Sequence, residues 1–195
     1  MTTRVPAKEI TGLYGAVVKT FASKMFGSVP ESLGVMWHNV PVMKASMGFG
    51  QKLQKWDACD ESLKSYAHMA VASLVGCSWC LDFNYFMANN KGLDLEKARE
   101  IPRWRDSEVF TDLEREVLAY AEAMTTAPIG VTDKMVASLL AQLGPAALVE
   151  LTSVIGFANL TTRGNVALGI ESEGFAAACG LKPLAERTEA VASPA

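Results

Sequence analysis

Apolar residues recur every three or four positions along most of this chain, and no long stretch alternates apolar with polar residues. A period near 3.6 places such residues on one face of a helix, whereas a strand with one buried face needs a period of two. Between residues 9 and 26, for example, Leu13, Val17, Phe21 and Met25 are spaced four apart. The pattern therefore predicts an all-α fold.

Glycine, proline and capping residues divide this pattern into separate helices. Gly76 follows an apolar run and is expected to end or kink a helix. Asp94 is an expected N-cap, and Thr111-Asp112-Leu113-Glu114 has the sequence of a capping box. We expect residues 102–110 to form a connection and the tail after Pro183 to fray. The predicted helices span about 9–26, 30–38, 42–56, 61–74, 78–90, 94–100, 111–124, 132–144 and 145–170.

The length and composition suit one helical domain, residues 1–195, with an N-terminal helical arm. Half of the 195 residues are hydrophobic and a fifth are charged, which is enough apolar material for a core. The net charge is −3 and no basic cluster occurs, so nucleic acid is not an expected partner. No run of about 18 uninterrupted apolar residues occurs, so no membrane span is expected. Because the N-terminus lacks the apolar segment of a secretory signal, we expect a cytoplasmic protein.

Four cysteines limit the metal and redox chemistry open to the chain. They are Cys59, Cys77, Cys80 and Cys179, and the middle two form a C-x-x-C pair. A zinc ribbon needs a second such pair, so a metal site is not expected. Thiol–disulfide chemistry would need no bound cofactor, only an external electron donor. Structural disulfides are rare in a reducing compartment. We therefore interpret Cys59 and Cys179 as buried apolar residues, and Cys77 with Cys80 as the candidate catalytic pair.

The motif Cys77-Ser78-Trp79-Cys80 places two cysteines three residues apart, on one face of a helix with side-chain origins about 5–6 Å apart. That separation is within reach of a disulfide. Cys77 also stands where a helix is expected to begin, and unpaired backbone N–H groups there stabilise a thiolate. The spacing therefore suits a reversible dithiol. On spacing alone, two buried cysteines that never react are an equal alternative.

The segment from Ala70 to Phe86, which holds the C-x-x-C motif, resembles the core of the carboxymuconolactone decarboxylase and alkylhydroperoxidase D superfamily. Three further segments resemble parts of the same superfamily. Residues 37–41 resemble its segment before a proline-started helix, and residues 110–121 resemble its capped helix after the redox helix. Residues 159–169 resemble its terminal helix. The resemblance covers roughly residues 30–175. It implies an all-α, alkylhydroperoxidase D-like domain that assembles as a homo-oligomer, often a trimer or a hexamer.

The peroxidase branch of that superfamily implies a role for each cysteine: Cys80 would attack the peroxide and Cys77 would close the disulfide. In that branch, a glutamate twelve residues before the first cysteine and a histidine four after the second relay a proton. Ser65 and Asn84 occupy those positions here. Asn84 cannot relay a proton near neutral pH, although it can donate a hydrogen bond to a thiolate one turn away. The helix-start argument instead favours Cys77 as the more acidic thiol, and both assignments stay open.

The missing relay matters because general acid–base catalysis typically contributes about 100- to 10,000-fold to a rate. His68 and Glu61 lie one turn on either side of Ser65 in the same predicted helix and are the candidate substitutes. The alternatives are a histidine at the surface or at the edge of the core, and a solvated carboxylate at a helix start. Asp82 is expected to face solvent, because a carboxylate beside Cys80 would raise the pKa of its thiol.

These observations lead to three hypotheses. The first is a thiol-dependent peroxidase or dithiol–disulfide oxidoreductase that acts through Cys77 and Cys80 on a hydroperoxide or a small disulfide. It would take electrons from an external thiol and would be slow without the relay. The second is a lactone decarboxylase, although no histidine or arginine cluster accompanies the core segment. The third is a non-enzymatic, redox-sensing oligomer.

Overall fold

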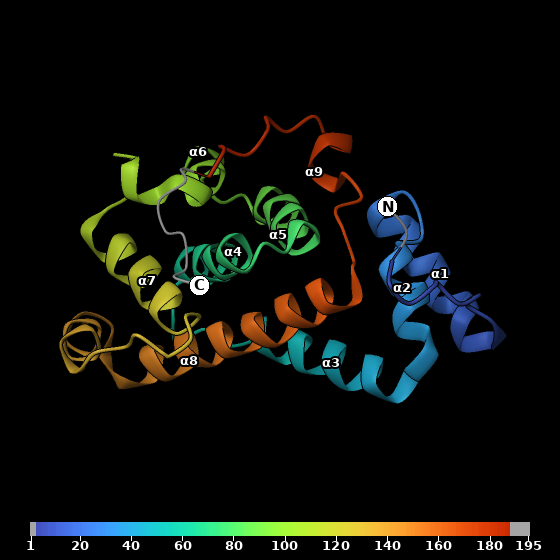
Figure 1. Ribbon diagram of the computed structural model, residues 1–195, viewed down its shortest axis with the longest axis horizontal. Helices are drawn as coiled ribbons and strands as arrows, with labels where there is room; N and C mark the ends of the chain where they lie inside the picture. The colour runs from blue at the N-terminus through green and yellow to red at the C-terminus, as the bar shows by residue number, and fades with distance from the viewer. Residues whose placement is uncertain (1–2, 188–195) are drawn as a thin grey trace.

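The computed structural model describes residues 3–187, which fold into helices joined by turns and short loops, with no strand among them (Figure 1). The expected all-α fold is therefore confirmed. Short 3-10 helices, labelled η, connect some of the α-helices. In chain order the elements are α1 (Gly12–Phe26), α2 (Glu31–Met36), η1 (Trp37–Asn39), α3 (Val40–Leu53), α4 (Glu61–Val75), α5 (Ser78–Asn90), α6 (Leu95–Glu100), η2 (Ile101–Asp106), α7 (Asp112–Ala123), α8 (Asp133–Leu168) and α9 (Phe175–Ala178).

Helix α4 lies at the centre of the helical body, with α5, α7 and α8 packed around it (Figure 1). Tyr66 of α4 is fully buried, as are Leu151 and Ile155 of α8. A buried ion pair also joins these two helices, because the Nζ atom of Lys64 lies 2.8 Å from the carboxylate of Glu150. The C-x-x-C segment is therefore attached to the best-packed part of the molecule.

Several helix ends follow the capping residues that the sequence indicates. Thr111 accepts a hydrogen bond from the N–H of Glu114 at the start of α7, and the Glu114 carboxylate accepts one in return, which confirms the capping box. The side chain of Asp94 accepts two backbone N–H bonds at the start of α6. The expected connection over residues 102–110 overlaps the 3-10 helix η2, because the buried ring of Trp104 anchors that segment.

Helix α8 is interrupted at Gly144, whose φ of 77° is open to glycine but strained for other residues. The predicted helix end near Gly144 and the predicted start at Pro145 match this break. By length and composition, α8 is the one helix within residues 3–187 that is apolar enough to cross a membrane. The core helix of a soluble protein passes the same test, and Leu151, Ile155 and Ala158 of α8 are buried in the core.

The chain after α9 returns along the body in an extended path. The N–H of Ala185 donates to the carbonyl of Arg99, and the guanidinium of Arg99 donates to the carbonyl of Pro183. These bonds fix the first part of the tail that was expected to fray. Residues 188–195, the remainder of that tail, lie outside the described residues.

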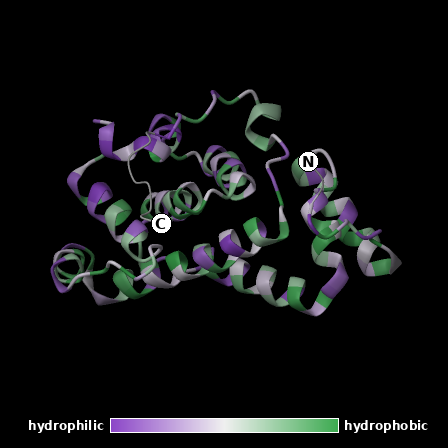
Figure 2. Ribbon diagram, viewed as in Figure 1, coloured by the Kyte–Doolittle hydropathy of each residue, from purple (hydrophilic) through white to green (hydrophobic). Residues whose placement is uncertain are grey.

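We call helices α1 to α3 the arm: α1 and α2 lie at one end of the body, and α3 runs beside the second half of α8 (Figure 1). A small cluster around Trp37 holds the arm together. The apolar stripe of α1 is not buried there: Leu13, Val17 and Phe21 are 91%, 66% and 62% exposed. Figure 2 shows hydrophobic residues along the arm as well as in the body. The predicted helix is thus confirmed, but its apolar face has no partner within the described part of this single chain.

Candidate redox site

Gly76 makes the turn that brings the two cysteines to the start of α5. Its φ is 78°, and its N–H donates to the carbonyl of Ala72 in the last turn of α4. A residue with a Cβ atom is strained in that conformation. Cys77 then becomes the N-cap of α5, because its Sγ accepts a hydrogen bond from the N–H of Cys80 over 3.2 Å.

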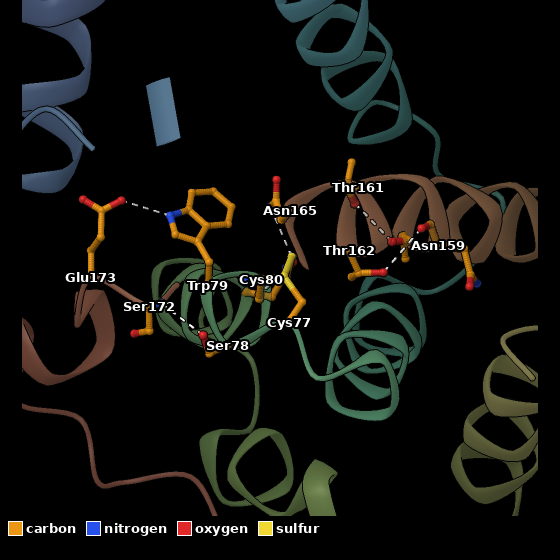
Figure 3. Close-up of a disulfide and its surroundings, with 12 residues drawn as sticks. Cys77, Ser78, Trp79, Cys80, Asn159, Thr161, Thr162, Asn165, Ser172 and Glu173 are labelled. Carbon is orange, nitrogen blue, oxygen red and sulfur yellow. Dashed lines mark hydrogen bonds between the residues drawn. A yellow bond between two sulfur atoms is a disulfide. The ribbon is translucent and has the colours of Figure 1, made fainter. Parts of the chain in front are cut away.

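Cys77 and Cys80 are joined by a disulfide, with their Cα atoms 5.3 Å apart (Figure 3). The pair occupies the cap and first turn of α5. Unpaired N–H groups and the positive end of the helix dipole favour negative charge on sulfur at that place once the bond is reduced. The arrangement can hold two electrons as a dithiol and give them up as a disulfide.

Both cysteines are covered in this conformation, with Cys77 1% and Cys80 2% exposed. They pack with Ala72 of α4, Leu81 of α5 and Val166 of α8. An apolar cover disfavours a charged thiolate unless hydrogen bonds or a dipole offset the loss of water. A substrate therefore reaches the sulfur atoms only after neighbouring side chains move.

One amide side chain reaches into this apolar cluster from another helix. Asn165, near the end of α8, donates a hydrogen bond from Nδ2 to the Sγ of Cys80 over 3.3 Å (Figure 3). Sequence reasoning includes Asn165 in the resemblance to the terminal helix but gives it no role. The two residues are 85 positions apart, and only the packing of α8 on α5 brings them together.

Comparison with known proteins assigns the chain to a family. Residues 41–123 match the sequence model of the carboxymuconolactone decarboxylase family. Over 141 residues the chain is 31% identical to the uncharacterized protein YnjA of Escherichia coli (strain K12), and the alignment covers 71% of this chain and 78% of YnjA. The chain belongs to the carboxymuconolactone decarboxylase family. The family expected from the C-x-x-C segment is thereby confirmed.

Two solved structures show how this family fold recurs. One is a protein of unknown function from Agrobacterium tumefaciens, a candidate AhpD antioxidant-defence protein, with a TM-score of 0.66 and 23% identity over 70% of this chain and 94% of that one. The other is the debrominase Bmp8, with a TM-score of 0.75 and 20% identity over 91% of this chain and 95% of that one. At these identities the likeness shows the fold alone, and the fold is the expected alkylhydroperoxidase D-like one.

In this family member, the two relay positions make local contacts within their own helices. The amide of Asn84 donates to the backbone carbonyl of Cys80 over 2.7 Å and not to the sulfur, a bond that its helical spacing also allows. The hydroxyl of Ser65 donates to the carboxylate of Glu61 over 3.4 Å. Ser65 is also two turns, or about 10 Å of helix, away from Ala72, which packs with the cysteine pair. Neither residue is placed to relay a proton to sulfur.

Glu61, in the first turn of α4, forms ion pairs with Lys64 of the same helix and with Lys91 at the end of α5. Burial opposes its charge, but the ammonium groups of Lys91 and Lys64 outweigh this effect and lower the pKa of the carboxyl group. The group is therefore an ion-paired carboxylate near neutral pH, and it has no proton to donate. It lies three turns of α4 before Ala72, about 16 Å along the axis.

His68 lies one turn before Ala72 on the same face of α4. Its side chain is half-buried, and burial, with a smaller effect of Lys91, lowers its pKa to about 4. The imidazole is therefore neutral near pH 7 and a weaker base than an ordinary histidine. Its role as a substitute base stays a prediction.

The expectation that Asp82 faces solvent is wrong. Its carboxylate is buried and accepts hydrogen bonds from the N–H groups of Phe175 and Ala176, each over 2.9 Å, and from the hydroxyl of Ser172 over 2.7 Å. The first N–H groups of a helix lack partners within the helix, and Asp82 supplies an acceptor for those of α9. Asp82 thus fastens the segment after α8 onto α5.

Aromatic rings flank the pair on the side of α5 that faces α9 and the arm. Trp79 stacks on Phe83 with ring centroids 4.8 Å apart, and Phe175 packs edge-on against Trp79 at 5.9 Å. Phe26, the last residue of α1, lies 5.7 Å from Phe83. The indole N–H of Trp79 donates to Glu173 over 3.2 Å (Figure 3). The first turn of α5 is thus linked to the segment after α8 through Trp79 and, through Phe83, to the arm.

The remaining two cysteines differ from each other. Cys59 is buried as expected, and burial, followed by the nearby charge of Glu150, raises the pKa of its thiol to about 11. The expectation that Cys179 is buried is wrong, because it is exposed. It follows α9, a short helix that buries only Phe175 and Ala176.

Proposed function

We propose that the protein is a thiol-dependent peroxidase or dithiol–disulfide oxidoreductase in which Cys77 and Cys80 alternate between dithiol and disulfide. The bonded pair at the N-terminus of α5 carries the proposal. Each sulfur has a hydrogen-bond donor: the N–H of Cys80 for Cys77, and the amide of Asn165 for Cys80. Such donors stabilise a thiolate, which is the species that attacks a peroxide or a disulfide.

The proposed reaction balances with the two sulfur atoms and an external donor. The thiolate of Cys80 attacks one oxygen of the hydroperoxide, the O–O bond breaks, and the departing alkoxide takes a proton from solvent and leaves as an alcohol. The thiol of Cys77 then attacks the resulting sulfenic acid, forms the disulfide and releases water. Two equivalents of an external thiol reduce this disulfide and leave as their own disulfide. A reducing cytoplasm would supply that thiol.

The reaction should be slow. Because Ser65 and Asn84 replace the relay residues, solvent has to protonate the departing alkoxide. The loss of a positioned acid typically costs about 100- to 10,000-fold in rate. The apolar cover over Cys77 and Cys80 also has to open before each turnover.

The proposal includes a homo-oligomer, as the resemblance to the superfamily implies. The stripe of Leu13, Val17 and Phe21 on α1 supports it, because large exposed apolar patches on proteins mark interaction surfaces. Light scattering on the purified protein gives the number of chains. A trimer or a hexamer is expected, and a single chain at all concentrations would contradict this part of the proposal.

The activity is tested by peroxide consumption with a dithiol donor, in wild type, Cys80→Ser and the control Cys179→Ser. Cys179 is an exposed cysteine outside the pair, so its replacement controls for thiol loss alone. We expect the wild type and the control to consume peroxide equally, and Cys80→Ser to lose at least about 100-fold. Equal rates in wild type and Cys80→Ser would end the proposal. A reversible disulfide without turnover would favour the redox-sensing oligomer.

Reductive dehalogenation is a second candidate, favoured by the stack of Trp79 on Phe83 beside the pair and by the fold shared with a debrominase. Two thiols would give two electrons to a brominated aromatic ring, and the products would be a ring C–H bond, bromide, a proton and the disulfide. Bromide release from tribromopyrrole by the reduced protein tests it, and no release above that of Cys80→Ser would exclude it. Lactone decarboxylation ranks lower, because no histidine or arginine cluster accompanies the core segment. Within residues 3–187, the one side chain from outside α5 that hydrogen-bonds to Cys80 is the amide of Asn165.

A further inference from the structure

The two sulfur atoms receive their hydrogen bonds from different kinds of donor. The Sγ of Cys77 accepts from the backbone N–H of residue 80, which almost any residue there would supply. The Sγ of Cys80 accepts from the side chain of Asn165, which is the one side-chain hydrogen bond to either sulfur in the described part of the chain. The identity of residue 165 therefore decides whether Cys80 has a donor.

We propose that Asn165 is a positioning residue that stabilises the thiolate of Cys80 and so determines which of the two cysteines is charged in the reduced protein. The inference rests on the proposed function in one respect, since it takes the pair to work as a dithiol. It goes further because it assigns control over Cys80 to a helix outside the C-x-x-C motif and outside both relay positions.

The surroundings of Cys80 make such a donor necessary. Ala72, Trp79, Leu81 and Val166 pack around the pair and carry no charge, and the indole N–H of Trp79 donates to Glu173 and not to a sulfur. Burial among apolar groups disfavours a thiolate, whereas a hydrogen bond to the charged form favours it. Hydrogen bonds to a charged acceptor are about twice as strong as neutral ones. An amide also donates without titrating, so its effect does not change with pH.

The last turn of α8, which carries Asn165, is fixed by the N-terminal segment. The guanidinium of Arg4 donates to the carbonyls of Val166 and Ala167 over 2.7 and 2.9 Å, and its backbone N–H donates to the carbonyl of Leu168 over 2.9 Å. Donors and positive charge at this end of a helix satisfy its unpaired carbonyls and match its dipole. The amide of Asn165 is therefore presented from a capped turn and not from a frayed end.

This contact decides between the two assignments that the sequence leaves open. The start of α5 favours charge on Cys77, and the amide of Asn165 favours charge on Cys80. With the amide prevailing, as we propose, Cys80 is the thiolate that attacks, and Cys77 keeps the proton that leaves as water forms in the second step. The order of the proposed reaction then follows from a contact between α8 and α5.

The test is the pH dependence of alkylation of the reduced protein by iodoacetamide, followed separately at each cysteine by mass spectrometry. Asn165→Ala should raise the pKa of Cys80 by about one unit, which is about tenfold less thiolate at a fixed pH below it. Asn165→Asp should raise it further, because a carboxylate repels the thiolate. Asn84→Ala is the matched control, since its amide donates to the carbonyl of Cys80 and not to the sulfur. It should leave the pKa of Cys80 unchanged.

An unchanged pKa of Cys80 in Asn165→Asp would overturn the inference. If Asn165→Ala does not fold, the nearly isosteric Asp variant carries the test alone. If Asn165 had only a structural role, its variants would change the thermal stability. The pKa of Cys80 would then not rise in steps from wild type to Asn165→Ala to Asn165→Asp. The measurement uses no peroxide, so an inactive wild type would remove the proposed function and leave this inference standing. An active wild type with no shift in either variant would do the reverse.

Discussion

The cysteine centre and the arm are both built from apolar helices, but the apolar faces are buried at the centre and exposed on the arm. At the centre, Cys77 and Cys80 are enclosed by α4, α5 and α8 of their own chain. On the arm, Leu13, Val17 and Phe21 of α1 point outwards. Apolar spacing predicts a helix in both regions and is right in both. It does not say whether the apolar face finds its partner in the same chain.

The difference follows from the number of neighbours that each helix has in space. Helix α4 is covered by α5, α7 and α8, whereas α1 contacts a small cluster around Trp37 and reaches the body at its end through Phe26. Removing apolar surface from water is favourable by about 25 cal/mol per Å². The centre is therefore covered within one chain, whereas the exposed stripe on the arm is the surface that we propose for self-association.

The largest expected effect comes from replacing one leucine in each region. Leu151→Ala leaves a cavity in the fully buried core beside α4 and should lower the free energy of unfolding by about 2–5 kcal/mol. Leu13→Ala removes an exposed side chain and should change it by less than about 0.5 kcal/mol under conditions that keep the chain monomeric. Urea unfolding measures both. Equal losses would show that α1 is part of the core.

The next effect concerns the proposed partner of the arm. The double substitution Val17→Asp and Phe21→Asp places two charges on the apolar stripe, and burying unpaired charge is costly. We expect at least about 100-fold weaker self-association, read by light scattering over a dilution series. Ile129→Asp, at an exposed apolar position of the body, is the matched control and should leave the assembly intact. An unchanged mass in the double variant would remove α1 from the interface.

A smaller expected effect is the pH dependence of stability, which should differ between His68 in the body and His38 in the arm. The pKa of His68 is about 4 in the folded protein and near 6.5 when unfolded, so the unfolded chain binds the extra proton between these values. Stability should therefore fall as pH falls from 6.5 towards 4, by about 1–3 kcal/mol from this group. His68→Gln should lose less stability over that interval than His38→Gln, which alters the exposed histidine of the arm. Parallel curves for the two variants would contradict the lowered pKa of His68.

Much of the fold follows from local signals that a sequence displays directly. The capping box at Thr111, the break at Gly144 and the start of α5 after Cys77 depend on neighbouring residues, and the structure has all three. The disulfide is also a local feature, because a spacing of three positions places both cysteines on one helical turn, within bonding distance.

The residues that sequence reasoning misplaced depend on contacts between distant segments. Asp82 is buried because the start of α9 returns to it after about ninety residues and needs an acceptor. Cys179 is exposed because α9 is too short to cover it. The amide of Asn84 bonds within its own helix, and Asn165 reaches Cys80 from α8. No local pattern distinguishes these two asparagines.

The central claim is that the bond between residues 77 and 80 forms and breaks in the folded protein. The most direct measurement mixes the reduced protein with a hydroperoxide and follows its thiols by mass spectrometry under native conditions. We expect the loss of two hydrogens to map to Cys77 and Cys80, with recovery of both thiols when a dithiol is added. A pair that stays reduced in hydroperoxide, or a disulfide that opens only in denaturant, would contradict the account.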